Sequence, residues 1–88
     1  MSVTQVSNVD NKIHYGSMWR EVYTVGAADV NITCSHRIEG RMLDVRERST
    51  GCMLFEGLDY TISTDGTNKI ILSGALGFEA TIIVQNIE

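Results

Sequence analysis

The chain has 88 residues, 43% of them hydrophobic, and a formal net charge of −4 at pH 7. A chain of this length forms one domain, which buries roughly 60–65% of the surface that its unfolded state exposes and has little room for a deep active-site cavity. The negative charge disfavours a nucleic-acid-binding protein, which needs a surplus of Lys and Arg on one face. No apolar run approaches the ~18–20 residues that span a bilayer.

Short apolar and β-branched segments recur about every ten residues and are separated by turn residues. The predicted strands are residues 2–7, 12–15, 19–25, 30–34, 41–46, 52–56, 58–63, 69–72 and 80–85, with turns at 8–11, 26–29, 35–40, 49–51, 65–66 and 74–77. Short strands at this spacing are typical of an all-β protein. We therefore expect a single domain over residues 1–88, a small antiparallel β-sandwich or a partly open barrel.

The segment from residue 58 to 72 carries the clearest strand pattern. Leu58, Tyr60 and Ile62 alternate with polar residues, which places them on one face of a strand. Asp65-Gly66 then predicts a tight turn, because glycine adopts positive φ without a Cβ clash. The expected core consists of inward-facing residues from most strands: Ile32, Leu43, Val45, Leu54, Tyr60, Ile62, Ile70, Leu72, Ile82 and Val84.

One helical pattern competes with this interpretation. Between residues 36 and 48, Ile38, Met42 and Val45 fall at i, i+4 and i+7. Gly40 disfavours a helix there, and the alternation of Leu43 and Val45 with polar residues favours a strand. We expect a strand, with one helical turn before Gly40.

Two cysteines, Cys34 and Cys52, stand 18 positions apart. On the predicted strands Cys34 shares a face with Ile32, and Cys52 shares one with Leu54. Free cysteines are among the most buried residues, so we expect two reduced thiols in the core. A single disulfide bridge is the alternative.

Residues capable of catalysis or metal binding are few. Cys34, His36, Cys52 and His14 have zinc-binding atoms but lack the paired Cys-x-x-Cys or His-x-x-x-His spacings of zinc sites. No nucleophile elbow supports a Ser/His/Asp triad. We therefore expect no catalytic residue, no cofactor and no metal.

Charged and aromatic residues each form one local group. The four arginines between positions 37 and 48 are interleaved with three acidic residues, 4 − 3 = +1, which indicates a mixed-charge face rather than a phosphate-binding track. Tyr15, Trp19 and Tyr23 form the one aromatic group. Core packing is one interpretation of these three residues, and a protein interface is the other, because Trp and Tyr are enriched at interface hot spots.

The C-terminal half resembles a known class of domain. Residues 53–62 (MLFEGLDYTI), residues 69–76 (KIILSGAL) and residues 80–84 (ATIIV) are similar to the β-domains by which bacteriophage tail fibres and related appendages, or decoration proteins, attach to the particle. The resemblance covers about residues 41–87. These domains often carry proline in the loop that is residues 74–77 here, and this chain has none. The resemblance implies a structural, non-enzymatic role without a cofactor.

We expect a virion structural protein, a decoration, adaptor or head–tail accessory, that docks on other virion proteins or on itself as a homo-oligomer. The absence of proline supports association, because sheet edges left unprotected pair with other strands. The N-terminal segment lacks the basic and apolar regions of a signal peptide, which predicts synthesis in the host cytoplasm. The alternative is a small carbohydrate- or ligand-binding β-module that uses Tyr15, Trp19 and Tyr23 as a stacking surface.

Overall fold

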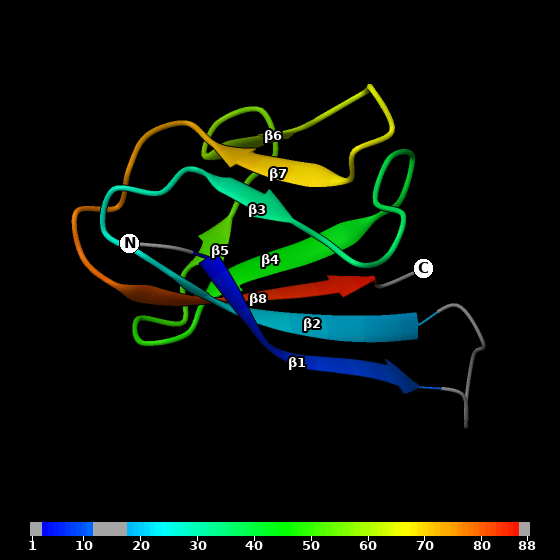
Figure 1. Ribbon diagram of the computed structural model, residues 1–88, viewed down its shortest axis with the longest axis horizontal. Helices are drawn as coiled ribbons and strands as arrows, with labels where there is room; N and C mark the ends of the chain where they lie inside the picture. Colours follow the sequence, from blue (N-terminus) through cyan, green and yellow to red (C-terminus); the bar gives the residue numbers. More distant parts are fainter. Residues whose placement is uncertain (1–2, 12–17, 87–88) are drawn as a thin grey trace.

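A computed structural model describes residues 3–11 and 18–86 of the chain, without the side chains of residues 9–11 and 18. In these residues the chain forms strands and turns and no helix (Figure 1). The strands are β1 (Val3–Asn11), β2 (Met18–Val25), β3 (Asn31–Thr33), β4 (Leu43–Glu47), β5 (Met53–Leu54), β6 (Tyr60–Ile62), β7 (Lys69–Leu72) and β8 (Ala80–Asn86). The described part of the chain holds no helix with the length and apolar character needed to traverse a bilayer.

The strands form two antiparallel sheets that lie face to face (Figure 1). The first sheet has the order β1-β2-β8-β4-β5, and the second has the order β3-β7-β6. The chain passes between the sheets after β2, β3, β5 and β7. The predicted all-β sandwich is confirmed.

The core lies between the two sheets and is made by the inward positions of each strand. On β8, Ala80, Ile82 and Val84 are buried while Thr81 and Ile83 between them are partly exposed, as the period of two in a strand requires. The buried hydrophobic residues are Trp19, Tyr23, Val25, Ile32, Cys34, Ile38, Val45, Tyr60, Ile70, Leu72, Ala80, Ile82 and Val84. Seven of the ten predicted core residues are in this set, and Leu43, Leu54 and Ile62 pack against it partly buried.

Two turn predictions have different outcomes. The Asp65-Gly66 turn between β6 and β7 is confirmed, with Gly66 at φ +82° and the Asp65 carboxylate accepting a 3.1 Å hydrogen bond from the Thr67 amide. The turn predicted at residues 8–11 is wrong, because these residues continue β1 and pair with β2 from Asn8↔Glu21 to Asn11↔Met18. An edge strand needs only its backbone for this pairing, so its Asn and Asp residues do not end it. The strand predicted at residues 12–15 lies outside the described residues.

Three local predictions are corrected. No helical turn precedes Gly40; a turn closed by the Arg41 amide on the Ile38 carbonyl, at 3.1 Å, directs Ile38 into the core. Leu58 does not share the buried face of Tyr60, because it precedes β6 in a turn and is 72% exposed. Cys52 is exposed for the same kind of reason, since it belongs to the turn between β4 and β5 rather than to a strand.

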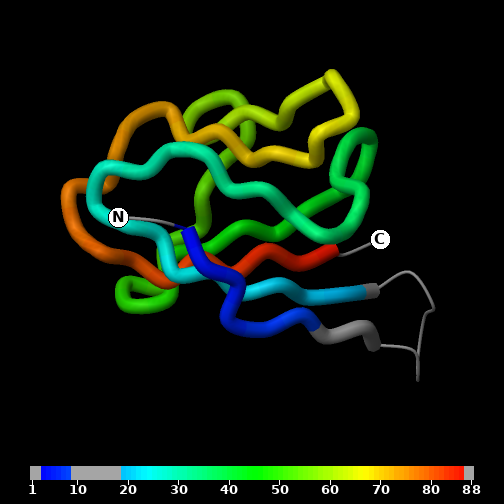
Figure 2. The backbone as a smooth tube through the Cα atoms, in the orientation of Figure 1, coloured from blue at the N-terminus to red at the C-terminus, as the bar shows by residue number. Residues whose placement is uncertain are grey.

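Strand β1 contains a bulge that changes its direction. Gln5 pairs with Tyr23 and Ser7 pairs with Val22, so Val6 is an extra residue without a partner on β2. A bulge bends its strand and increases the local twist. Figure 2 shows the bend, which carries the start of β1 out of line with β2 and toward β3. Gln5 thereby reaches the gap between the sheets, and Val6 is 62% exposed.

The alternation of buried and partly exposed residues on β8 predicts how substitutions at neighbouring positions change stability. Ile82→Ala removes a fully buried side chain and should lower the free energy of unfolding by about 2–5 kcal/mol, measured by urea denaturation. Ile83→Ala, at the neighbouring outward position, is the matched control and should cost less than half as much. Equal losses at the two positions would mean that the inward face of β8 has been assigned incorrectly.

Candidate functional site

The most unusual group of side chains surrounds Glu21, a carboxylate in the core of the sandwich. Strand β2 alternates inward and outward positions, and Trp19, Glu21 and Tyr23 point inward. Glu21 is 0% exposed. An ionised carboxylate buried without partners is strongly destabilising, so its surroundings must provide donors.

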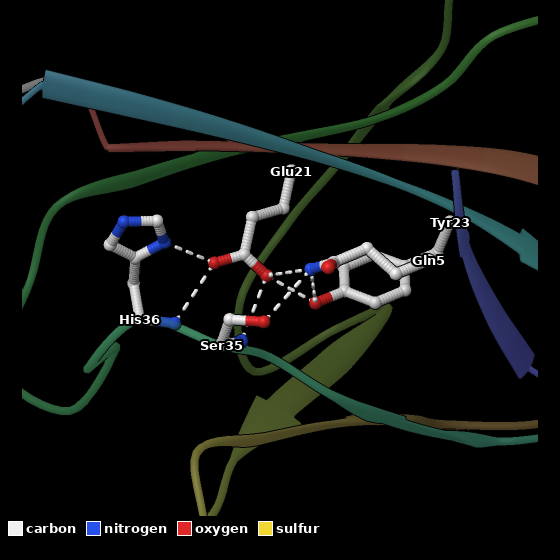
Figure 3. A network of polar contacts seen from close by, with 5 residues as sticks. All are labelled: Gln5, Glu21, Tyr23, Ser35 and His36. Atoms are coloured by element: carbon white, nitrogen blue, oxygen red, sulfur yellow. Dashed lines mark hydrogen bonds and ion pairs between the residues drawn. The ribbon is translucent and has the colours of Figure 1, made fainter. Parts of the chain in front are cut away.

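Five contacts surround this carboxylate (Figure 3). Oε1 accepts hydrogen bonds from Gln5 Nε2 at 3.0 Å, from the Ser35 amide at 2.9 Å and from the Tyr23 hydroxyl. Oε2 accepts one from the His36 amide at 2.9 Å and also contacts His36 Nδ1. The donors come from β1, from β2 itself and from the segment that follows β3, so Glu21 joins the two sheets.

Two further contacts complete this cluster, which we call the Glu21 network (Gln5, Glu21, Tyr23, Ser35 and His36). The Gln5 amide nitrogen also lies 3.0 Å from the Tyr23 hydroxyl and 2.9 Å from Ser35 Oγ. The indole of Trp19 stacks on the His36 ring, with centroids 4.3 Å apart and planes inclined by 6°. His36 is therefore held on one side by a carboxylate and on one face by an aromatic ring.

The pKa values in the network follow from this geometry. Burial acts to raise the pKa of Glu21, but the hydrogen bonds from Tyr23, Ser35 and His36 outweigh it and hold the pKa below its ordinary value. Burial and the bond to Glu21 raise the pKa of Tyr23. Burial, with the nearby Glu21 charge, raises the pKa of Cys34 to about 12. At neutral pH the tyrosine and the thiol are thus protonated, and neither is an activated nucleophile.

A shallow groove of about 270 Å³ lies beside the network, between the start of β1 and β3. Its lining is Val3, Gln5, Tyr23, Asn31, Thr33 and Ser35. The polar side-chain groups that Gln5, Tyr23 and Ser35 could offer to a ligand are engaged in the Glu21 network. The arrangement therefore joins the two sheets.

The residues predicted as an aromatic interface have other positions. Trp19 is 7% exposed and Tyr23 is 2% exposed, and both belong to the core. Tyr15 lies outside the described residues. The core-packing interpretation therefore describes Trp19 and Tyr23, and neither presents its ring on the surface of this chain.

The candidate metal ligands are not brought together. Cys34 is buried, Cys52 is exposed in the turn after β4, and His36 contacts Glu21. His14 lies outside the described residues. Within the ranges 3–11 and 18–86 no three His, Cys, Asp or Glu side chains form a group that could hold a metal ion. Both cysteines are free thiols.

Sequence reasoning missed the Glu21 network. The signal was present in β2, where Trp19, Tyr23 and Val25 alternate with outward residues and Glu21 falls in the same inward series. A carboxylate at such a position needs buried donors. The pattern cannot reveal that Gln5, Ser35 and His36 supply them, because these residues are 14–16 positions from Glu21 in the chain.

Comparisons of this chain with protein families, with curated proteins and with solved structures found no match.

The network makes a prediction about pH. Glu21→Gln replaces a carboxylate acceptor by an amide whose NH₂ group faces donors, and should lower the free energy of unfolding at pH 7 by about 1–3 kcal/mol. Because the pKa of Glu21 is lower in the folded chain, its ionised form stabilises the fold above the ordinary value of 4.5, and this contribution is lost as pH falls through the folded pKa. The difference between wild type and variant should therefore shrink below pH 4.5.

Urea denaturation at pH 7 and at several pH values below 4.5 measures this difference. Glu79→Gln removes an exposed carboxylate and serves as the control, which should change stability by less than about 0.5 kcal/mol at pH 7. A wild-type advantage over Glu21→Gln that stays constant down to pH 2 would contradict the proposed role of the ionised carboxylate.

The cysteines make a second prediction. The folded protein should react rapidly with a disulfide reagent at Cys52 only, because Cys34 is buried and its pKa is raised to about 12. In denaturant both thiols should react. A reductant should leave the melting temperature unchanged. Two rapid reactions in the folded state, or a lower melting temperature on reduction, would show that the thiols are placed differently.

Proposed function

We propose that this protein is a non-enzymatic virion structural protein of a bacteriophage, a decoration, adaptor or tail accessory, that acts by docking on other virion proteins or on further copies of itself. The observation that carries the docking proposal is a rigid turn that presents two large apolar side chains to solvent. This turn, residues 55–59, connects β5 to β6, and we call it the apolar turn.

Hydrogen bonds fix the backbone of the apolar turn. The Phe55 carbonyl accepts bonds from the Leu58 amide at 3.2 Å and from the Asp59 amide at 2.8 Å. The Asp59 carboxylate accepts a bond of 2.8 Å from the Phe55 amide. Gly57 takes φ +88°, which its missing Cβ permits, and its amide donates to the Tyr60 carbonyl.

The second sheet holds the turn as well. Ser73, just after β7, donates from its amide to the Asp59 carbonyl at 2.8 Å and from its hydroxyl to the Leu58 carbonyl at 2.9 Å. The turn is therefore anchored at both ends, and its conformation is set before any partner binds. Preorganisation of this kind strengthens association, because less conformational entropy is lost on binding.

The apolar turn leaves large apolar side chains exposed to solvent, and a binding partner would bury them. Phe55 is 56% exposed and Leu58 is 72% exposed. Met53, on the adjacent edge strand β5, is 41% exposed. Large apolar side chains exposed close together in the chain are candidates for a contact site, because a few such anchors supply most of the binding energy of an interface.

The virion assignment rests on the resemblance of residues 41–87 to phage appendage domains, a range that contains the apolar turn. The interior supports a structural role over an enzymatic one, because its polar side chains are used to join the sheets. The carbohydrate-binding alternative used Tyr15, Trp19 and Tyr23 as its stacking surface. Trp19 and Tyr23 are buried, and Tyr15 lies outside the described residues.

The proposal is tested on particles of the phage that encodes the chain. Mass spectrometry should detect the protein in purified particles, and purified wild-type protein should co-sediment with particles that lack it. The double variant Phe55→Ser/Leu58→Ser should bind at least about 10-fold more weakly, since loss of interface anchors often costs 2 kcal/mol or more. Phe78→Ser is the matched control, because Phe78 is 47% exposed but lies in the connection between β7 and β8.

Thermal melting of each variant checks that the fold is retained. The proposal fails if the protein is absent from the particles and remains a strict monomer by light scattering. It also fails if the Phe78 control loses as much binding as the apolar-turn variant.

A further inference from the structure

The outer face of the five-stranded sheet, which is turned away from β3, β7 and β6 in Figure 1, carries a pattern that the docking proposal does not use. The strand register places one outward residue of each strand in a row across the sheet. The row is Ser7, Val22, Ile83, Arg46 and Met53. Val22 and Ile83 thus form an apolar centre between Ser7 on one side and Arg46 on the other.

A hollow of about 330 Å³ lies over this centre. Its lining is Val6, Ser7, Arg20, Val22, Arg48 and Ile83. The bulge in β1 forms one wall, because Val6 is the extra residue and stands 62% exposed beside Ser7. Bulges often redirect a side chain at a binding site. Val6, Val22 and Ile83 supply apolar lining, and Arg20 and Arg48 supply two cationic side chains.

The two arginines are unpaired within residues 3–11 and 18–86. Arg46 is held by Asp44, with Nε 3.0 Å from the carboxylate oxygen, but neither Arg20 nor Arg48 has a side-chain hydrogen bond or ion pair there. Glu79 lines a different hollow on the other side of Arg48 and makes no ion pair with it. Two arginines with no partner among the described side chains therefore line one hollow together with Val6, Val22 and Ile83.

The charge of this face is opposite to that of the whole chain. The outward charged residues on β2, β8 and β4, with the residue after β4 and the residue before β8, are Arg20, Asp44, Arg46, Arg48 and Glu79, which sum to 3 − 2 = +1. The chain as a whole carries −4. An arginine binds a carboxylate through two parallel hydrogen bonds, which makes guanidinium pairs suited to acidic partners.

We propose that this hollow binds an acidic segment of a protein partner, with carboxylates on Arg20 and Arg48 and an apolar side chain on Val22 and Ile83. The inference rests on the proposed docking function and names the chemistry of the partner. A nucleic acid fits less well, because two free arginines on a chain of net charge −4 do not form the run of cations that a phosphate backbone requires.

The test uses the full chain labelled with ¹⁵N and a blocked hexapeptide that alternates valine and glutamate, titrated at low ionic strength. Amide shifts should concentrate at Val6, Ser7, Arg20, Val22, Arg48 and Ile83. Arg20→Gln/Arg48→Gln should raise the Kd at least 10-fold. Arg37→Gln is the control, since it removes the charge of one exposed arginine outside the hollow, and should leave the Kd within twofold of wild type.

Further probes separate the possible outcomes. The same peptide with glutamine in place of glutamate should bind at least 10-fold more weakly. Tighter binding of inorganic phosphate or of a single-stranded oligonucleotide to the hollow, or no loss of peptide binding in the arginine double variant, would overturn the inference.

The docking proposal fails independently of this one. Phe55→Ser/Leu58→Ser should leave peptide binding unchanged while it weakens binding to particles. If Arg20→Gln/Arg48→Gln binds particles as well as wild type does, the inference about the hollow is wrong and the docking proposal stands.

Discussion

The burial of Glu21 is the constraint on which much of the remaining structure depends. The carboxylate constrains the positions of two segments. The segment after β3 must place the amides of Ser35 and His36 within hydrogen-bonding distance of it, and β1 must do the same for Gln5. Removing one hydrogen-bond partner of a buried charge lowers the stability of the fold by far more than the free energy of the same hydrogen bond in water, because the charge stays buried without that partner. The network therefore fixes how the small sheet sits on the large one, which apolar packing alone specifies less sharply.

The bulge in β1 connects this interior requirement to the outer surface. A regular β1 would continue straight beside β2, whereas the extra residue bends the strand so that Gln5 enters the network. The same extra residue, Val6, is then displaced to the outer face, where it forms a wall of the arginine-lined hollow. The bulge in β1 thus helps to join the two sheets and also shapes a candidate binding surface. It also interrupts the longest sheet edge of the described chain, which lacks proline for that purpose.

The fold class and the core were predictable because they depend on short-range alternation. On β4 and β8, for example, Val45, Ile82 and Val84 follow the period of two, and the sheets bury them accordingly. Leu58 was incorrectly placed on the strand face of Tyr60, and Cys52 was incorrectly assigned to the core, because alternation was extended into turns, where the period of two does not hold. Glu21 was missed for a different reason. Its donors are brought to it by the packing of two sheets, and no local pattern encodes that packing.

The arrangement of the surface argues for a role in assembly. The buried carboxylates are bound within the fold, Glu21 in its network and Glu47 by Ser49 and Thr50, and the candidate recognition surfaces lie on the outside of the sandwich. There the apolar turn presents Phe55 and Leu58 on a backbone fixed by Asp59 and Ser73. Arg20 and Arg48 lie on the outer face of the large sheet and have no ion pair with the side chains that the structure describes. The first surface suits a hydrophobic pocket and the second suits carboxylates, so a partner that met both would gain affinity from the turn and orientation from the charges. A small domain that offers two chemically distinct surfaces is suited to joining one protein to another, and this suitability is why we propose a docking role for it.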